Sequence, residues 1–271
     1  MRAAIIVNPA KSDVAEARTQ IDTTLTAAGW TPSLWLETTP DDPGMRMAQA
    51  AVESGVQLVV ICGGDGTVMA CLGALSGSGL PVAILPLGSG NLLARNLGIP
   101  LELDEALATV VDGEDRCIDL GMVGDQPFAV MAGMGFDAAM MADTTEGMKQ
   151  FAGWPAYVAS ALRHLRDPLM RVRLRIDGGP PLRRSARTVL IGNVGQLEGG
   201  LELLPDAAAD DGILAFSTWL SLRRGHFAIG CEWRTESCGG HIRRTVIWNV
   251  FAGSRSRSWP TGWHLVRWTA R

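Results

Sequence analysis

Residues 58–75 read LVVICGGDGTVMACLGAL, an apolar run that stops at Gly63-Gly64-Asp65-Gly66 and then resumes with a different spacing. The strand candidate at residues 57–61 ends in three β-branched residues and suits a strand covered on both faces, whereas residues 68–75 have helical spacing. In an open parallel sheet, anions bind where a strand ends and a helix begins, because exposed N–H groups and the helix dipole favour negative charge there. The stretch therefore predicts a phosphate-binding turn. The alternative is a plain turn in which Asp65 or Thr67 caps the helix.

The alternation of strand and helix continues on both sides of this stretch. Strands are expected at residues 3–7, 33–37, 57–61 and 81–85, and helices at residues 13–28, 44–54, 68–75 and 91–97. Asp13, with Glu16 three residues later, resembles a capping box at the start of the first helix. This alternation predicts an α/β fold with a parallel, doubly wound sheet through about residue 125.

A second glycine-rich turn follows one strand later, at Pro86-Leu87-Gly88-Ser89-Gly90-Asn91. Two loops rich in N–H groups at one edge of a sheet indicate a polyphosphate site. The alternative is a turn capped by Asn91. Neither loop is a Walker A motif, because no Lys-Ser/Thr follows, and neither is GxGxxG.

Beyond residue 125 the pattern changes to short β runs. Residues 170–176 alternate apolar residues with arginine, and residues 185–193 and 213–217 are further strand candidates, with one helix expected at 148–165. We expect a mainly antiparallel β-sandwich domain over residues 126–216. Eight arginines lie between Arg163 and Arg187. They are either a solvated strand face or a surface for anionic lipid headgroups.

Composition narrows the class of protein. The chain has 271 residues, of which 47% are hydrophobic, enough for two modest cores. We find no membrane span and no signal peptide, so we expect a cytoplasmic protein. The five cysteines form no CxxC pair, which argues against a zinc site or a disulfide framework.

Residues 217–271 differ from the rest in composition. Residues 1–216 hold 15 Lys+Arg against 26 Asp+Glu, whereas residues 217–271 hold 9 against 2, together with six of the nine tryptophans. Our hypothesis is that this tail is translated out of the ancestral reading frame. A native basic, aromatic-rich arm that binds lipid or nucleic acid is the alternative.

Four motifs in a fixed order resemble the bacterial diacylglycerol kinase family, whose catalytic domain is shared with sphingosine and ceramide kinases. They are VVICGGDGTV at 59–68, LPLGSGNLLARNLGIP at 85–100, MAGMGFDAAM at 131–140 and IGNVGQLEGGLELLPDAAADDGIL at 191–214. The motif GGDGT also occurs in NAD kinases, but the other three motifs do not fit those enzymes. The resemblance implies an ATP-binding domain at residues 1–125 and a lipid-substrate domain at residues 126–216.

The resemblance also implies site residues. The nucleotide-binding positions would be Asn8, Thr39, Gly63, Gly64, Asp65, Gly66, Thr67 and Ser89. Lys11-Ser12-Asp13 departs from the Ser-Gly of the family's first loop. In the DDG segment, Asp211 matches a carboxylate that binds Mg²⁺, with the carbonyls of Ala208 and Ile213 in the same shell. In isolation, Asp210-Asp211-Gly212 would be read as a hairpin turn.

The implied activity is transfer of the ATP γ-phosphate to diacylglycerol, giving phosphatidic acid. A kinase for a sphingoid base or a polyprenol, and a catalytically impaired nucleotide- or lipid-binding protein, stay open as alternatives. The family's catalytic base is an acidic residue near the C-terminus, and nothing between Ser217 and Arg271 matches its motif, so the catalytic base is unknown. We expect a lipid substrate at the inner face of the membrane, with peripheral membrane contact, and no nucleic acid, and we leave a homodimer open.

Overall fold

The computed structural model describes residues 1–10, 14–31, 33–124, 126–135, 169–176, 179–197, 200, 202–219, 243–251 and 264–269. The chain divides into two units, Met1–Cys117 and Ile118–Arg271. The domain boundaries expected from the sequence, after residues 125 and 216, stay predictions.

The first unit is built on a parallel four-stranded sheet in the order β2-β1-β3-β4. Its strands are β1 (Ala3–Val7), β2 (Leu34–Glu37), β3 (Leu58–Gly63) and β4 (Val82–Pro86). Ile5 pairs with Trp35 on one side and with Val60 on the other. Every residue of β1 and β3 is buried, so the two central strands are covered on both faces.

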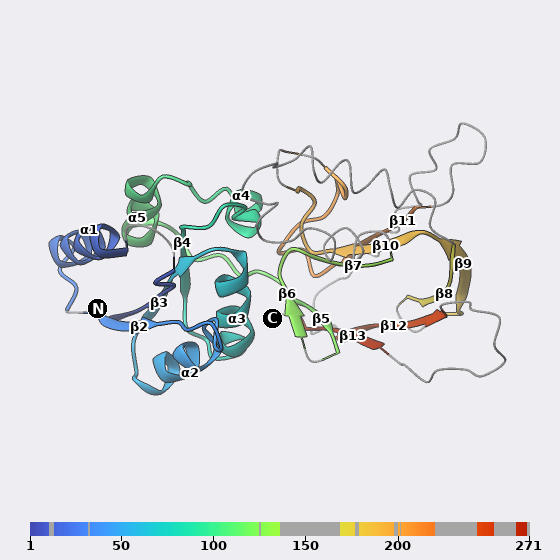
Figure 1. Ribbon diagram of the computed structural model, residues 1–271, viewed down its shortest axis with the longest axis horizontal. Helices are drawn as coiled ribbons and strands as arrows, with labels where there is room; N and C mark the ends of the chain where they lie inside the picture. The colour runs from blue at the N-terminus through green and yellow to red at the C-terminus, as the bar shows by residue number, and fades with distance from the viewer. Residues whose placement is uncertain are drawn as a thin grey trace. The chain divides into compact units, whose positions relative to one another are not determined.

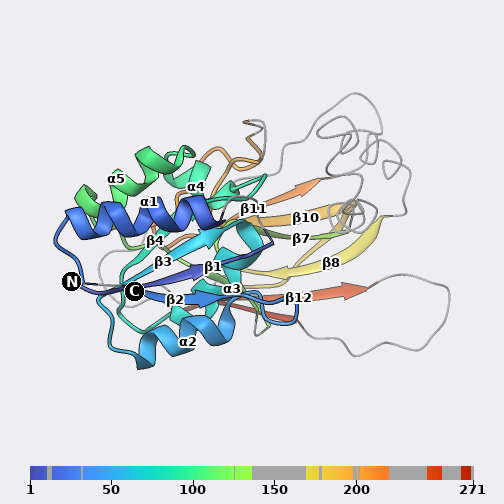
Figure 2. The same ribbon diagram turned by 60° about the vertical axis from the view of Figure 1, so that its left-hand side comes forward.

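Helices cover both faces of this sheet, as Figures 1 and 2 show. One face packs on α1 (Val14–Ala27) and α5 (Leu103–Asp112), through side chains such as Ile21 and Leu107. The other face is next to α2 (Met45–Glu53) and α3 (Asp65–Leu75). The short helix α4 (Leu92–Leu97) follows β4. The predicted doubly wound sheet is therefore confirmed.

The strand order defines where a ligand can bind in this unit. From β1 the chain passes to β2 on one side and then to β3 on the other, so the order reverses between β1 and β3. In open α/β sheets, ligands bind outside the carboxyl ends of the strands at such a reversal. Asn8 follows β1 and Gly64 follows β3, which places both residues at this point.

Two details of the first unit differ from the sequence prediction. Helix α3 begins at Asp65 rather than at residue 68, because Asp65, Gly66 and Thr67 form its first turn. Helix α5, which follows Glu102 in extended conformation, was not assigned from the sequence. Asp13, the expected start of the first helix, lies outside the described residues.

The second unit consists of antiparallel strands. One sheet has the order β11-β10-β7, from Ala215–Trp219, Thr188–Gly192 and Met131–Gly135. Another has the order β13-β12-β8-β9, from His264–Thr269, Arg243–Phe251, Met170–Arg175 and Leu182–Ala186. The described part of the unit also contains a hairpin of β5 (Gly121–Val123) and β6 (Gln126–Phe128).

Both larger sheets contribute to one core. Val172 and Leu174 of β8 pack with Val189 and Ile191 of β10 in a single buried cluster. The predicted antiparallel β domain is therefore confirmed, although the helix expected at 148–165 lies outside the described residues.

Part of the unusual tail joins this unit. Strand β12 pairs with β8 and with β13, with Trp248 opposite both Leu174 and His264. Tail residues therefore supply two of the four strands of one sheet. Within the part of the chain that the structure describes, no helix has the length and hydropathy needed to cross a membrane.

Candidate functional site

The first glycine loop connects two buried elements. Strand β3 ends at Gly63, and α3 begins at Asp65 after Gly64 in an extended conformation. The start of α3 has no side-chain cap, which leaves N–H groups of its first turn available to an anion. A Cβ atom placed on Gly66 would meet no atom within 4 Å. The space beside the first turn is therefore open.

The second glycine loop lies directly against the first. The N–H of Leu87 donates to the carbonyl oxygen of Gly63 at 3.1 Å. A Cβ atom placed on Gly88 would lie 2.4 Å from the Cα of Gly64, closer than real Cβ atoms come to other atoms. Glycine at position 88 is thus required for the contact.

Asp65 links the two loops. Its Oδ1 accepts a hydrogen bond from the N–H of Leu93 at 3.3 Å, in the first turn of α4. Asp65 therefore caps the helix of the second loop, and it does not form the cap on α3 that the plain-turn alternative expected. Ser89, the other residue predicted to hold phosphate, lies exposed in the second loop.

Asn91 sets the shape of the second loop. Its φ of 48° lies in the left-handed region. Its Oδ1 accepts from the N–H of Gly88 at 2.9 Å, and its Nδ2 donates to the carbonyl oxygens of Gly88 at 2.7 Å and Pro86 at 3.2 Å. Asn91 precedes α4 but forms no side-chain cap on it, so the side chain holds the loop closed instead.

Asn8 joins the first strand to the first loop. Its backbone N–H donates to the carbonyl oxygen of Cys62 at 3.1 Å, and its Nδ2 donates to Oγ1 of Thr67 at 3.4 Å. Thr67 is 4% exposed, so its hydroxyl has a fixed position. The predicted positions Asn8, Gly63 to Thr67 and the loop of Ser89 are thus connected at the end of the sheet.

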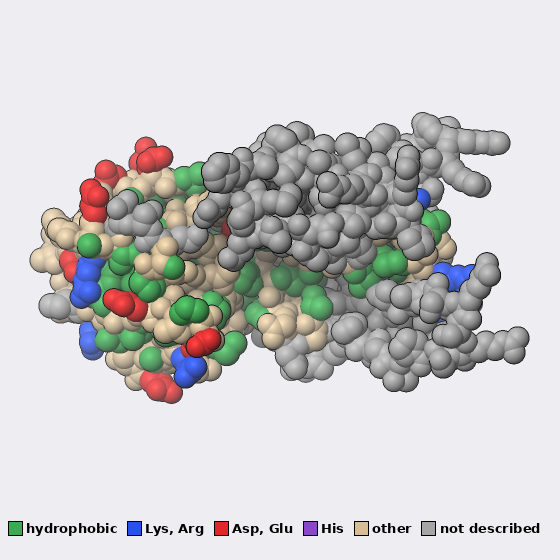
Figure 3. Space-filling view, viewed as in Figure 1, with side chains coloured by type: hydrophobic (Ala, Val, Ile, Leu, Met, Phe, Trp, Pro, Cys, Tyr) green, Lys and Arg blue, Asp and Glu red, His purple; other side chains and the backbone are tan. Residues whose placement is uncertain are grey.

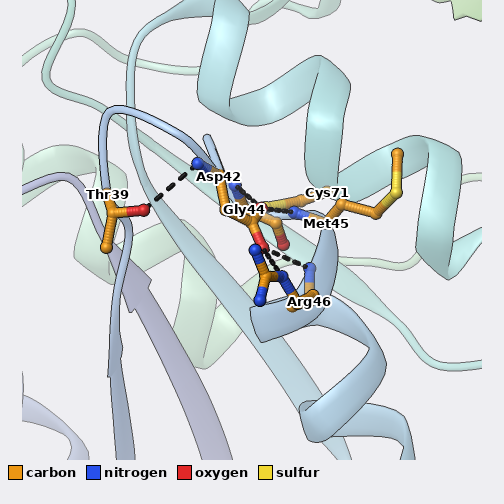
Figure 4. A network of polar contacts seen from close by, with 6 residues as sticks. All are labelled: Thr39, Asp42, Gly44, Met45, Arg46 and Cys71. Atoms are coloured by element: carbon orange, nitrogen blue, oxygen red, sulfur yellow. Dashed lines mark hydrogen bonds and ion pairs between the residues drawn. The ribbon is translucent and has the colours of Figure 1, made fainter.

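Thr39 lies in a separate turn at the end of β2 (Figure 4). Its Oγ1 accepts from the N–H of Asp42 at 3.1 Å. In the described part of the chain, Thr39 shares no hydrogen bond with the two glycine loops. It lies at the same end of the sheet, because it follows the carboxyl end of β2.

Asp42 caps helix α2 (Figure 4). Its carboxylate accepts from the N–H groups of Gly44 at 3.0 Å, Met45 at 2.8 Å and Arg46 at 3.2 Å. The Gly44 N–H is the main cause that lowers the pKa of Asp42, despite the burial that opposes it. Burial, with a smaller effect of the Asp42 charge, raises the pKa of the Cys71 thiol to about 12. The protonated thiol donates to the carbonyl oxygen of Gly44 at 3.6 Å and joins α3 to α2.

A second polar cluster lies in the other unit, around the predicted metal residue Asp211. Asp211 Oδ1 accepts from the N–H of Ile213 at 2.8 Å, and Gly212 has a φ of 75°. The neighbouring N–H of Gly212 donates to Oδ2 of Asp119 at 2.7 Å. The Asp210-Asp211-Gly212 turn is therefore fastened to a buried carboxylate from a distant part of the chain.

Asp119 and Asn193 were not identified from the sequence. Asp119 is 5% exposed. The side chain of the fully buried Asn193 donates, through Nδ2, to the backbone carbonyl oxygen of Asp119 at 2.7 Å. In the sequence, Asp119 is distinguished only by its position between two apolar residues, Ile118 and Leu120. No local pattern indicates its contact with Gly212. Burial raises the pKa of Asp119, the Gly212 N–H opposes this effect, and the charges of Asp211 and Asp210 add to it.

The donors of this cluster fit a hard cation. The carboxylates of Asp119 and Asp211 and the carbonyls of Ala208 and Ile213 are oxygen ligands, which Mg²⁺ prefers. The negative charges of Asp211 and Asp210 disfavour ionisation of Asp119. A bound cation would offset this repulsion between the carboxylates. Within the described residues, Oδ1 of Asn193 is buried without a hydrogen-bond partner. Among the residues that the structure describes, no group of three or more His, Cys, Asp or Glu side chains is placed to hold a metal ion, so carbonyls and water would have to complete the shell.

Family models match both units. Residues 2–123 match the diacylglycerol kinase catalytic domain, and residues 129–251 match the YegS C-terminal NAD kinase beta sandwich-like domain. The second match includes residues 217–251 of the tail.

Curated relatives support the same assignment. A "Probable lipid kinase YegS-like" protein of Pseudomonas fluorescens is 37% identical over 194 residues, which are 70% of this chain and 64% of the relative. A protein of the same name from Serratia proteamaculans is 39% identical over 176 residues, 62% of this chain and 57% of that one. The chain thus matches less than two thirds of the length of these relatives.

Solved structures share the fold across nearly the whole chain. A diacylglycerol kinase from Bacillus anthracis has a TM-score of 0.75 at 20% identity, covering 99% of this chain and 94% of that one. An NAD kinase from Archaeoglobus fulgidus in complex with ATP has a TM-score of 0.51 at 12% identity, covering 100% and 90%. At these identities the likeness concerns the fold alone.

The doubly wound domain, its paired glycine loops and the β domain together define the fold class that includes diacylglycerol kinases and NAD kinases. Within this class, the two parts of the chain are similar, in this order, to a diacylglycerol kinase catalytic domain and to a YegS C-terminal NAD kinase beta sandwich-like domain.

Proposed function

We propose that this protein is an ATP- and magnesium-dependent lipid kinase, with diacylglycerol as the acceptor and phosphatidic acid as the product. The observation that carries the proposal is the contact between the two glycine loops after β3 and β4, beside the reversal of strand order between β1 and β3. The lipid class follows from the names of the relatives, and diacylglycerol from the name of the matched catalytic domain.

Each loop residue has a role in this proposal. The first-turn N–H groups of α3 bind phosphate oxygens, and Gly66 leaves room for their approach. Asn8 orients the Thr67 hydroxyl, and Asp65 holds the second loop, with its exposed Ser89, against the first. Phosphoryl transfer depends mainly on such positioning and on charge stabilisation.

Phosphoryl transfer from ATP uses Mg²⁺ to offset negative charge, and oxygen ligands hold this ion in proteins. Asp211, with the carbonyls of Ala208 and Ile213, is the proposed site, and Asp119 holds the turn in place through Gly212. We propose peripheral contact with the cytoplasmic face of the membrane, where the lipid substrate lies.

A nucleotide- or lipid-binding protein without catalytic activity is the second candidate. It is favoured by the tail, in which Glu232 and Glu236 are the only acidic residues and neither lies in the family's base motif. A protein of this kind would bind ATP and lipid but would not transfer phosphate.

The test is transfer of labelled γ-phosphate to diacylglycerol, sphingosine, a polyprenol and NAD in parallel. We expect label in phosphatidic acid, dependent on Mg²⁺. NAD is included because NAD kinases share the fold. Label in NAD or in another lipid alone would overturn the diacylglycerol assignment. ATP binding without transfer to any acceptor would support the second candidate.

A further inference from the structure

Four arginines lie on one face of the second unit. Successive side chains of a strand alternate between the two faces of a sheet, so Arg171, Arg173 and Arg175 of β8 share one face. Arg183 of β9 lies directly opposite Arg173 and therefore joins them. These four residues are called the arginine face below.

The residues on the opposite side of β8 show which way the arginine face points. Val172 and Leu174, which alternate with the arginines, are 4% exposed and belong to the buried core. Arg171, Arg175 and Arg183 are exposed, and Arg173 is half-buried. Figure 3 shows Lys and Arg side chains at the surface over β8 and β9. The arginine face is therefore turned away from the core.

No negative charge balances these arginines within the described residues. Strands β8 and β9 contain five arginines and no Asp or Glu. The ion pair between Arg46 and Asp42 lies in the other unit. Like charges directly opposite each other destabilise an antiparallel pair, and Arg173 and Arg183 are such a pair. The arrangement is unfavourable for the isolated sheet and favourable for a sheet that meets an anionic surface.

We propose that the arginine face docks on an anionic lipid bilayer. This inference rests on the proposed function, because the proposed acceptor is a membrane lipid. Guanidinium groups bind phosphate with two parallel hydrogen bonds and are weakly hydrated, so they suit phospholipid headgroups. Arginines that recur along one face of a strand can meet several headgroup phosphates at once. Each arginine near an anionic bilayer strengthens binding by about fivefold.

Sedimentation with vesicles tests the proposal on the full chain. We expect binding to phosphatidylcholine vesicles that contain phosphatidylglycerol, much weaker binding to phosphatidylcholine alone, and release at high salt. The variant Arg173→Gln with Arg183→Gln should bind about twenty-five-fold less tightly, at about fivefold for each arginine. Its stability to urea should be unchanged or higher, because a like-charge pair is removed.

Two matched variants separate this effect from total charge and from guanidinium chemistry. Arg2→Gln with Arg18→Gln removes two exposed charges from the first unit and should bind vesicles like the wild type. Arg173→Lys with Arg183→Lys keeps the charge and should retain most of the binding. Equal loss in the Arg2 and Arg18 variant would overturn the assignment to the arginine face.

The remaining outcomes separate the inference from the kinase proposal. Transfer to short-chain diacylglycerol dispersed as monomers needs no bilayer, so the Arg173 and Arg183 variant should match the wild type in that assay. Transfer to monomers without any vesicle binding would overturn the docking surface and leave the kinase proposal intact. Vesicle binding without transfer to any diacylglycerol would overturn the kinase proposal and leave the docking surface intact. Tight binding of single-stranded RNA at salt that abolishes vesicle binding would also overturn the lipid assignment.

Discussion

At the scale of single residues, side chains near the two loops act on elements other than their own. Asp65 opens α3 but caps α4, and Asn91 precedes α4 but closes the loop before it. A local pattern cannot show this, because a cap is recognised by its neighbours in sequence. The residue types were identified from the sequence, whereas their partners required the fold.

Gly66 tests the phosphate loop. Gly66→Val should weaken ATP binding by at least about tenfold, because the branched side chain would fill the open space beside the first turn. The fold should survive, since the Cβ position meets no protein atom and the φ of Gly66 is not in the left-handed region. Isothermal titration calorimetry with ATP measures the change. Ala74→Val, in the last turn of α3, is the control for a valine placed in the same helix away from the loop. Unchanged affinity in Gly66→Val would remove this loop from the nucleotide site.

Asp42 tests the turn that carries Thr39. Its folded-state pKa lies below the ordinary value of 3.8, so its ionised form stabilises the folded state. The stabilisation should be complete at neutral pH and should disappear as the pH falls below about 4 towards the folded-state pKa. Urea unfolding of wild type and Asp42→Asn should therefore differ at pH 7 and converge in acid. The exposed neighbour Asp41→Asn is the control and should follow the wild type throughout. A difference that persists at low pH would show that ionisation of Asp42 is not the cause.

At the scale of elements, strands and helices were easier to identify than their contacts. The buried run of β3 and the alternation of β8 were both evident from the sequence, because burial fixes their periodicity. Helix α5 was missed because its apolar side, with Ala106 and Leu107, is short and follows an irregular segment. The contact of Asp119 with Gly212 joins residues 93 positions apart, beyond the reach of any local pattern.

The turn before β11 gives the metal prediction. If Asp211 binds Mg²⁺, Asp211→Asn should reduce the rise in melting temperature on adding Mg²⁺, because it removes a charged ligand. Asp119→Asn should act in the same direction by loosening the turn. Thermal unfolding with Mg²⁺ and with EDTA measures both, and the exposed Asp206→Asn in the same connection is the control. An equal Mg²⁺ shift in all four proteins would support a plain turn.

At the scale of the whole molecule, the fold class and the order of the two domains were predicted correctly. The fold class of the N-terminal domain follows from the repeated alternation of strand and helix signals. The position of the β domain after it follows from the change to strands in which arginine recurs at every second residue. The tail was not predicted, because its composition changes and no steady period continues through it. Strand β12 nevertheless pairs with β8 along five residues. The shifted reading frame stays a hypothesis, which resequencing the gene tests.

The tail also carries the prediction about activity. Without a carboxylate to accept the hydroxyl proton, transfer should be slower by roughly a hundred- to ten-thousand-fold. Replacing residues 217–271 with an in-frame family C-terminus should restore turnover, provided that the new segment supplies a strand in register with β8. Diacylglycerol phosphorylation in mixed micelles compares the two proteins. Equal turnover would mean that the present tail provides its own base, with Glu232 and Glu236 as the candidates.

The contact between Gly64 and Gly88 also limits how this sequence can evolve. A side chain at position 88 would overlap the backbone of the first loop, and no change of rotamer can relieve that overlap. Substitution at this position therefore requires the whole second loop to move, and Asp65 would lose its partner Leu93 in the same step. A protein that carries only one of the required substitutions would have a damaged contact between the loops. The two loops should therefore be inherited together as one unit. Recombination between relatives should be tolerated before β3 or after α4, and rarely between them.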